Sequence, residues 1–311
     1  MTRPRPNERL ILTSAIAASL TCVGSDLRSG PQTSIGSSEE RRGSLGISIQ
    51  GPERMVDVGG RRLHSFTYGN GSPTVVLVSG LETPQEYWNP VIPALAAKTA
   101  VVTFDRAGIG KSEIGDLPTH GEQSAKDLRV LLDQLTVPRP YILVGHSYGG
   151  GVVRLFASMY PGDMAGLILE ETQHEDILIE MGKLLKGKDL ETLEQVLVPR
   201  FDAPQNPKTE GDYRNATKEQ LRKSTPLPRI PFVILTCADR AKAMQPMFSD
   251  GAIEEIAKVD SALMDRLAAS VPGGKQIVVE GTGHNVHVDK PEALIAPVLE
   301  MINEVKGEKR D

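Results

Sequence analysis

The sequence predicts an α/β fold built on a doubly wound, mostly parallel sheet of eight strands with helices on both faces. Short apolar runs recur along the chain, and most runs after the second are separated by stretches with helical spacing of apolar residues. Apolar strands need cover on both faces, and strands that alternate with helices pair in parallel. The eight expected strands cover residues 55–58, 62–68, 74–78, 100–104, 141–144, 166–169, 231–235 and 276–279.

The folded domain is expected over residues 52–306, and its first elements form a hairpin. Gly59 and Gly60 separate the first two expected strands, as a tight turn requires. The apolar run at 74–78 predicts a central strand. Helices are expected over 91–98 and 120–135, the second because four of its leucines share one face.

The alternation of strands and helices breaks at about residues 174–229. Two amphipathic helical stretches begin there at Ile177 and Leu190, a loop follows over 199–207, and a further short helix is expected after it. The last two strands come next, and Pro291 opens a closing helix that runs to Val305. The sequence therefore predicts an inserted helical segment between two strands of the sheet.

The N-terminus differs from the rest of the chain. Arginines precede an apolar run over residues 10–20 and small residues follow, which is the order of a secretory signal peptide at 1–25. A tail with an accidental apolar run is the alternative. The run is too short to span a bilayer, so no stable membrane insertion is expected. Residues 26–51 are rich in Ser and Gly and predict a flexible linker, and 307–311 form a tail. These features favour a secreted or periplasmic protein, with a cytoplasmic one as the alternative.

The composition excludes some classes of function. With 35 Lys and Arg against 40 Asp and Glu, the net charge is −5 and offers no basic surface for nucleic acid. Only Cys22 and Cys237 are present, and removal of the signal peptide leaves one cysteine, so no internal disulfide is expected. The histidines are scattered without the spacing of metal ligands, and no metal or cofactor is expected.

The most informative segment is Tyr141-Ile-Leu-Val-Gly145-His146-Ser147-Tyr148-Gly149, an apolar strand that runs into a Gly-x-Ser-x-Gly corner before a helix. A serine on so sharp a corner exposes its Oγ, and a Cβ at either flanking glycine would meet a neighbouring element. This segment resembles the nucleophile elbow of the α/β-hydrolase family, in its serine esterase and lactonase branch. The resemblance covers roughly residues 52–306 and implies that the insertion is a cap over the active site.

The resemblance also implies a base for Ser147. Gly283-His284 follows the last expected strand, where the catalytic histidine of this family lies, so His284 is expected to accept the serine proton. His287 is expected to have a structural role. His146 lies within the corner, and we expect it to shape the turn.

Two backbone N–H groups are expected to stabilise the oxyanion. Tyr148 follows the nucleophile and supplies one. Ser79-Gly80-Leu81 resembles the family's His-Gly-x segment, so Leu81 supplies the other, although Ser79 replaces the usual histidine and puts the rigidity of the loop in question. Tyr87 and Trp88 are candidates for the substrate pocket, and so is Met181 on the cap, with packing in the protein interior as the alternative.

The segment Asp105-Arg-Ala-Gly-Ile-Gly110-Lys-Ser112 matches another turn of the same family. Its last three residues also suggest a nucleotide-binding P-loop, but that motif needs a glycine at the position of Asp105, whose carboxylate would repel phosphate. We therefore expect Asp105 to bind amides of its own turn.

Two carboxylates compete for the third position of the catalytic triad. Asp239 follows the strand at 231–235, the commoner place in this fold, but lacks the glycine that usually precedes the acid. Glu171 follows the strand at 166–169, where a minority of these hydrolases place the acid. We favour Glu171 and keep Asp239 as the alternative.

The resemblance implies a cofactor-free serine hydrolase of small carboxylic esters, lactones included. A serine nucleophile argues against epoxide hydrolases and dehalogenases, which use an aspartate at this position. A receptor that binds a small ligand in the same pocket is the alternative of another class. A serine-triad lyase or perhydrolase would keep the residues and change the reaction.

Overall fold

The computed structural model describes residues 51–199, 210 and 214–307. The expected signal peptide and all but the last residue of the expected linker lie outside these residues. Residues 200–207 of the expected loop and 308–311 of the tail lie outside them as well.

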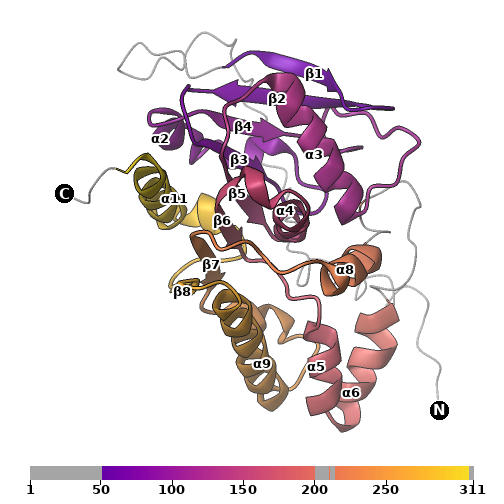
Figure 1. Ribbon diagram of the computed structural model, residues 1–311. Helices are drawn as coiled ribbons and strands as arrows, with labels where there is room; N and C mark the ends of the chain where they lie inside the picture. Colours follow the sequence, from indigo (N-terminus) through magenta and orange to yellow (C-terminus); the bar gives the residue numbers. More distant parts are fainter. Residues whose placement is uncertain (1–50, 200–209, 211–213, 308–311) are drawn as a thin grey trace, which may run out of the picture.

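The sheet has eight strands in the order β1-β2-β4-β3-β5-β6-β7-β8, so the predicted fold class is confirmed (Figure 1). β2 pairs antiparallel with β1 and β4, and the remaining neighbours pair in parallel. β3 and β5 lie at the centre and are completely buried. The strands are β1 Glu53–Asp57, β2 Arg62–Tyr68, β3 Thr74–Val78, β4 Val101–Phe104, β5 Tyr141–His146, β6 Met164–Glu170, β7 Phe232–Cys237 and β8 Lys275–Val279.

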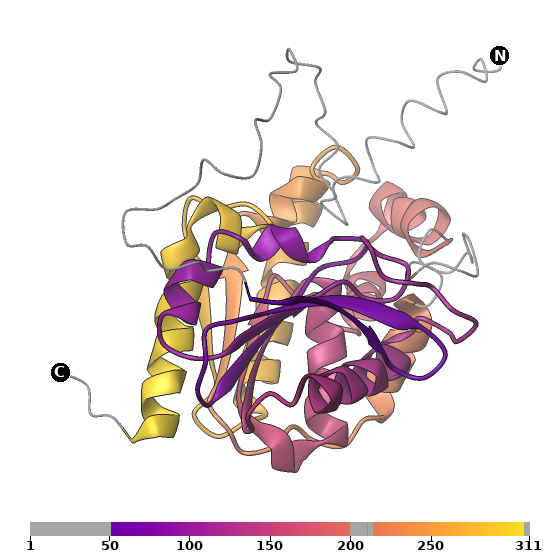
Figure 2. The same cartoon turned by 90° about the horizontal axis from the view of Figure 1, so that it is seen from above.

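Helices cover both faces of the sheet. α2 and α11 pack with the short helix η1 on one face, and α3, α4 and α9 pack on the other (Figures 1 and 2). The bounds outside the insertion are η1 Gln85–Trp88, α2 Ile92–Ala96, α3 Gly121–Leu135, α4 Tyr148–Met159, η2 Pro161–Asp163, η5 Arg240–Met244, α9 Asp250–Ala269, α10 Val286–Asp289 and α11 Pro291–Lys306.

The described residues between β6 and β7 contain several helical elements, as the break in alternation predicts. They are α5 Ile177–Leu184, α6 Gly187–Thr192, the π-helical turn η3 Leu193–Leu197 and α8 Arg214–Lys223. α5 packs beside α9, whereas α8 packs against α3 and α4 (Figure 1). The inserted segment is therefore anchored both to α9 and to α3 and α4.

The patterns described above do not predict α9, the longest helix in the part of the chain that the structure describes. Its signals are nonetheless local. The Ser249 hydroxyl accepts the Ala252 N–H as an N-cap, and Ile253, Ile256 and Leu263 recur on its buried face.

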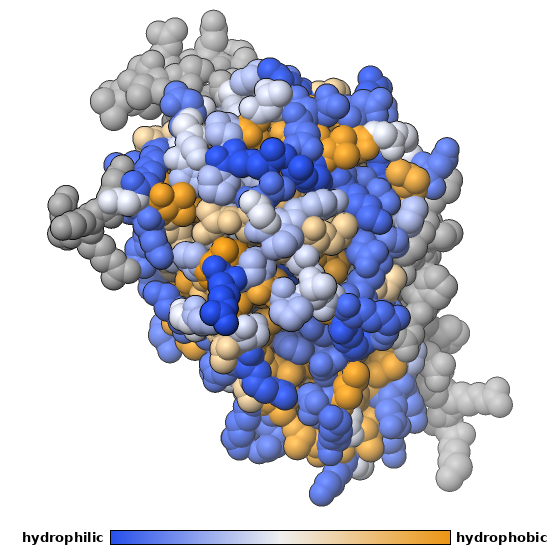
Figure 3. Space-filling model, viewed as in Figure 1, coloured by the Kyte–Doolittle hydropathy of each residue, from blue (hydrophilic) through white to orange (hydrophobic). Residues whose placement is uncertain are grey.

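The visible surface in Figure 3 is mainly hydrophilic, and its apolar side chains form small scattered groups. Scattered apolar residues are normal on a globular protein, so this face shows no broad apolar docking area. Within the described ranges, no helix has the length and apolar character needed to cross a bilayer.

The register of the parallel strands decides where a site can form. Gly145 lies opposite Leu169, and His146 lies opposite Glu170, whose other neighbour is Leu235. The carboxyl ends of β5, β6 and β7 therefore meet at one edge, where ligands bind in open α/β sheets.

Candidate active site

Ser147 lies at the corner between β5 and α4, with φ 51° and ψ −117°. A non-glycine residue at such a positive φ stores about 1–3 kcal/mol of strain, and this strain collects at functional sites. The corner has no room beside it. A Cβ at Gly145 would lie 2.6 Å from the Gly149 carbonyl oxygen, and a Cβ at Gly149 would lie 2.2 Å from that of Val78. Both glycines are therefore required by the close approach of the backbone.

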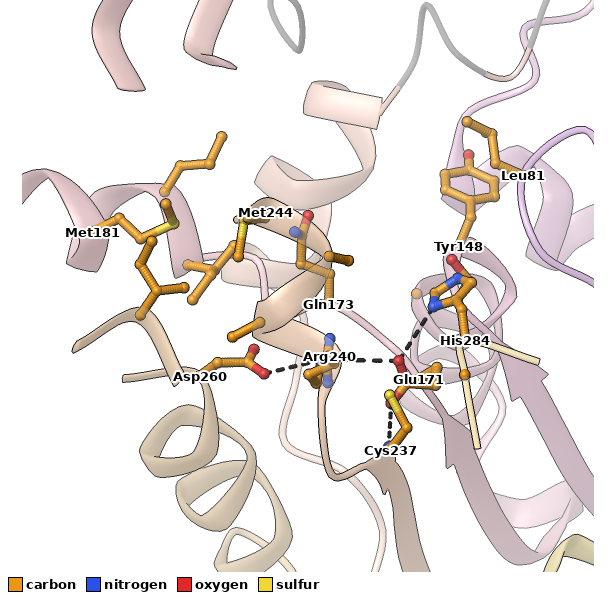
Figure 4. A pocket seen from close by; sticks show the side chains of 18 of the residues that line it. Leu81, Tyr148, Glu171, Gln173, Met181, Cys237, Arg240, Met244, Asp260 and His284 are labelled. Carbon is orange, nitrogen blue, oxygen red and sulfur yellow. Dashed lines mark hydrogen bonds and ion pairs between the residues drawn. The ribbon is translucent and has the colours of Figure 1, made fainter. Parts of the chain in front are cut away.

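Ser147 opens on a cavity of about 280 Å³ between the sheet edge and the inserted helices. Six of the sequence-predicted site residues line it with Ser147, namely Leu81, Tyr148, Glu171, Met181, His284 and the alternative acid Asp239. Much of the remaining lining is apolar and includes Ile177, Leu178, Leu221, Met244 and Ile256. Residues that lie far apart in the sequence thus line one pocket (Figure 4).

His284 and Glu171 form a hydrogen-bonded pair in this cavity. The His284 ring donates from Nδ1 to Glu171 Oε2 at 3.2 Å, and the Cys237 N–H donates to Oε1 at 2.6 Å. Burial alone would raise the pKa of Glu171, but Arg240 and these hydrogen bonds outweigh it and hold the pKa below its usual value. Glu171 is therefore a buried carboxylate that stays ionised.

The tautomer of His284 follows from this pairing. An ionised carboxylate only accepts hydrogen bonds, so in the neutral imidazole Nδ1 carries the proton and Nε2 carries the lone pair. Nε2 is buried and has no hydrogen-bond partner among the described residues. The ring thus presents a basic nitrogen that can take a proton from a nearby hydroxyl.

Comparison with known proteins decides the family. The profile of the Alpha/beta hydrolase family matches residues 75–297, more than half of the chain. The protein belongs to the alpha/beta hydrolase family.

The relatives of this hydrolase carry different descriptions. YqjL of Bacillus subtilis, which is described as uncharacterized, is 26% identical over 249 residues, 78% of this chain and 88% of YqjL. A thermophilic esterase from Thermogutta terrifontis has a TM-score of 0.54 at 20% identity, covering 82% of this chain and 98% of its own. The enol-lactonase from Burkholderia xenovorans has a TM-score of 0.54 at 18% identity, covering 80% of this chain and 100% of its own. At these identities the two solved structures show the shared fold alone.

Of the two candidate acids in this hydrolase, the structure places Glu171 against His284. Asp239 borders the cavity, but its carboxylate binds Lys242 Nζ at 2.6 Å and its side chain is 65% exposed. The arrangement agrees with the expectation for Glu171, and its catalytic role remains a prediction.

Arg240 and Asp260 form an ion pair next to Glu171. Arg240 Nε lies 3.9 Å from Glu171 Oε2 and 3.0 Å from Asp260 Oδ2, so His284, Glu171, Arg240 and Asp260 follow one another across the cavity wall (Figure 4). Burial alone would lower the pKa of Arg240, but the two carboxylates raise it overall, and the guanidinium stays charged. Arg240 therefore helps to keep the buried Glu171 ionised.

The two segments expected to supply the oxyanion donors lie beside Ser147. Leu81 and Tyr148 both line the cavity. A Cβ at Gly80 would lie 3.4 Å from Ser147 Cβ and 2.9 Å from His146 Nδ1, so the backbone of this loop rests directly on the corner. The Leu81 segment is thus placed as the resemblance implies.

The expectation that Trp88 lines the substrate pocket is wrong. Trp88 is completely buried, is absent from the cavity lining, and packs on His287 with 4.3 Å between ring centroids. The reason is that η1 faces the α2 and α11 side of the sheet, where Trp88 joins the core. Tyr87 is 40% exposed and does not line the cavity either, whereas Met181 does.

The other two histidines near the corner have structural contacts. His146 Nε2 donates to the His284 carbonyl oxygen at 2.9 Å, and burial lowers the pKa of His146 to about 4. His287 donates from its backbone N and from Nδ1 to Glu170 Oε1, at 2.8 and 2.7 Å. Both agree with the roles expected from the sequence.

Asp105 accepts the Lys111 N–H of its own turn at 3.2 Å, and it also binds the Gln85 N–H and the His64 ring. A Cβ at Gly110 would lie 2.2 Å from Asp105 Oδ2, so the turn closes on the carboxylate. Its amides hold a side chain where a P-loop would hold phosphate, and the rejection of a nucleotide site agrees with this geometry. In the part of the chain that the structure describes, no cluster of three or more His, Cys, Asp or Glu residues could hold a metal.

Sequence reasoning missed four charged residues around the site, Arg106, Glu210, Arg240 and Asp260. Arg106 follows Asp105 just past β4, and Arg240 follows the candidate acid Asp239 just past β7. An arginine at that position is a usable signal, because strand ends of this sheet edge meet at the site. The partners carry no local signal, because they come from distant segments.

Proposed function

We propose that the protein hydrolyses small carboxylic esters, lactones included, through an acyl-enzyme. One observation supports this proposal above the others: the strained Ser147 shares a cavity with the His284–Glu171 pair and with the two backbone segments that can bind an oxyanion. Serine, base and acid in this arrangement form the triad of acyl transfer.

The first half of the reaction acylates the serine. His284 Nε2 takes the proton from Ser147 Oγ as the oxygen bonds to the ester carbonyl carbon, and the N–H groups of Leu81 and Tyr148 stabilise the oxygen that becomes negative. Glu171 holds the ring and stabilises the imidazolium. When the C–O bond to the leaving group breaks, the imidazolium gives its proton to the departing alcohol, or to the tethered alcohol of an opened lactone.

The second half releases the acid. Water attacks the acyl carbon while His284 takes one of its protons, and collapse of the second tetrahedral intermediate returns that proton to Ser147 Oγ. The apolar cavity wall formed by Ile177, Met181 and Met244 favours substrates with a hydrocarbon portion, because burial of that portion supplies binding energy.

The test is a panel of p-nitrophenyl esters of increasing acyl length and of lactones, measured with wild type and Ser147→Ala. We expect Ser147→Ala to lower kcat by at least about 10³-fold without unfolding the protein. Ser158→Ala serves as the matched control, because Ser158 lies toward the other end of α4 and bonds Thr225 outside the cavity lining.

A variant Ser147→Ala that retains a tenth of wild-type activity would remove Ser147 as the nucleophile. If the wild-type protein binds esters in the cavity but turns none over, the receptor alternative replaces the hydrolase. A fluorophosphonate probe that labels Ser147, located by peptide mass spectrometry, reports the nucleophile independently of the substrate chosen.

A further inference from the structure

Arg106 contacts both segments assigned to the oxyanion hole. It follows Asp105 at the end of β4 and is buried. Its Nη1 donates to the Ser79 carbonyl oxygen at 2.5 Å and its Nη2 to that of Gly80 at 2.6 Å. On the other side, its Cζ lies 5.5 Å from the centroid of the Tyr148 ring. One guanidinium therefore touches the loop before Leu81 and the residue after the nucleophile.

The bond to Gly80 bears directly on the Leu81 donor. The carbonyl of Gly80 and the N–H of Leu81 belong to one planar trans peptide, in which the two groups point in opposite directions. Fixing the oxygen on Arg106 therefore fixes the direction in which the Leu81 N–H points. A cation at the oxygen also draws electron density through the amide and makes the N–H a stronger donor.

Glu210 fixes the guanidinium from the insertion. Arg106 Nε donates to Glu210 Oε1 and Nη2 to Oε2, and Oε2 also accepts the Glu82 N–H at 3.0 Å. Glu82 has a φ of 52°, so the loop is held in a strained form just after Leu81. Burial alone would lower the pKa of Arg106, but the Glu210 carboxylate raises it overall and keeps the cation charged.

The Arg106–Glu210 ion pair, called the clamp below, accounts for how the Ser79-Gly80-Leu81 loop is held in place. The family's usual histidine is replaced by Ser79, and the only hydrogen bond of the Ser79 hydroxyl among the described residues is a long one, 3.5 Å, to the Pro84 carbonyl oxygen. Arg106 instead binds two successive carbonyls of the same loop, and a planar guanidinium suits such paired acceptors.

We propose that Arg106 is the positioning residue of the oxyanion hole, with Glu210 holding its guanidinium in place. The inference rests on the proposed esterase function and adds the group that aims and polarises the Leu81 amide. It differs from a purely structural role, because the clamp should support the tetrahedral intermediate more than the bound substrate.

The test compares Arg106→Lys and Arg106→Met with wild type. Lysine keeps the charge but cannot bind both carbonyls and Glu210 in one plane. We expect Arg106→Met to lower kcat about 10²-fold, the effect of losing one oxyanion donor, with KM changed by less than about threefold. Arg106→Lys should fall between Met and wild type.

A transition-state readout separates positioning from stability. An alkyl boronic acid forms a tetrahedral adduct on Ser147, and its affinity should fall in parallel with kcat/KM across the variants. Affinity for an uncleaved ester, measured in the Ser147→Ala background, should stay within about threefold. Glu210→Gln keeps Arg106 in the chain and should give a smaller loss of kcat and of boronate affinity. This variant provides the test if Arg106→Met does not fold.

The chain offers a matched control in Arg154, which is also buried and binds Glu175 through two hydrogen bonds, at 2.7 and 3.0 Å, away from the oxyanion loop. Arg154→Met should lower the melting temperature and leave kcat and boronate affinity unchanged. If wild type shows Ser147-dependent hydrolysis while folded Arg106 and Glu210 variants keep kcat and boronate affinity within threefold, only the positioning proposal falls. If wild type shows no Ser147-dependent hydrolysis, the proposed function falls with it.

Discussion

Two adjacent glutamates at the end of β6 each bind a histidine, and only one of these pairs faces the cavity. Glu171 binds His284 beside Ser147, whereas Glu170 binds His287 in the buried space next to Trp88. The two histidines are three residues apart, His284 in the loop after β8 and His287 in α10. The fold thus contains two neighbouring carboxylate–histidine pairs near the end of β6.

The pairs differ in access. The Glu170–His287 side chains are 0% and 1% exposed and 2.7 Å apart, whereas His284 is 18% exposed and its bond to Glu171 is longer, at 3.2 Å. Burial alone would raise the pKa of Glu170, but the hydrogen bonds and charge of His287 outweigh it and hold the pKa below its usual value, so the carboxylate of the tighter pair stays ionised as well. A carboxylate–histidine pair therefore does not mark an active site by itself; a nucleophile and an open path must accompany it.

The largest expected effect comes from a substitution in the accessible Glu171–His284 pair. Glu171→Gln keeps the shape but removes the charge that fixes the His284 tautomer and stabilises the imidazolium. We expect kcat to fall on the order of 10⁴-fold with little change in the melting temperature. Steady-state kinetics on the best ester of the panel, with thermal melts alongside, measure both quantities.

The control is Glu170→Gln, the same change one residue earlier. It should cost about 1–3 kcal/mol of stability, because two donors of His287 lose a charged acceptor, and should lower kcat by less than about tenfold. If Glu170→Gln abolished activity while Glu171→Gln retained it, the assignment of the two pairs would be reversed.

The second effect concerns His146, whose ring lies between the pairs, 4.8 Å from the His284 centroid and 5.2 Å from that of His287. Burial lowers its pKa from 6.5 to about 4. Between these values the unfolded chain binds a proton that the folded protein rejects, so the stability that neutral His146 provides is complete above about pH 6.5 and falls as the pH drops toward 4. The loss is on the order of 3 kcal/mol.

Urea unfolding at several pH values from 7.5 to 4.5, with wild type and His146→Asn, measures this linkage. We expect the variant to be less stable at pH 7.5, because it lacks the bond to the His284 carbonyl, and the gap to close as the pH falls. The shifts of His120 and His174 are common to both proteins and cancel in the difference. If the unfolding free energies of the two proteins stay parallel across the pH range, His146 has the same pKa in the folded and unfolded states and the prediction is wrong.

Local signals account for what the sequence could predict. The glycines around Ser147, the Gly-His pair after β8 and the position of Glu171 just past β6 are each encoded within a few residues, and the sheet follows from apolar runs. Trp88 was misplaced because the choice between the cavity and the core depends on α2 and α11, which pack against η1 from distant parts of the chain.

Long-range ion pairs lie beyond local signals for the same reason. Arg106 and Glu210 are 104 residues apart, and Arg240 meets Asp260 only because α9 packs against η5. A charged residue in a sequence is usually a solvated one, so nothing local distinguishes the partners Glu210 and Asp260 from the many exposed charges of the chain.

The smallest expected effect comes from Asp239→Asn. This change tests a third carboxylate near the same histidine, in addition to Glu170 and Glu171. Asp239 binds Lys242 at the surface, and an exposed pair of this kind contributes about 0.2–1 kcal/mol at most. Its carboxylate makes no hydrogen bond to His284 among the described residues, since the Nδ1 donor of that ring is already bound to Glu171. We expect kcat to change by less than about tenfold, the effect of a group beyond the first contacts of the site. Measured beside Glu171→Gln on the same ester, an inactive Asp239→Asn with an active Glu171→Gln would move the acid to the end of β7. The serine, the base and the oxyanion segments would keep their roles, because none of them depends on which strand end supplies the carboxylate.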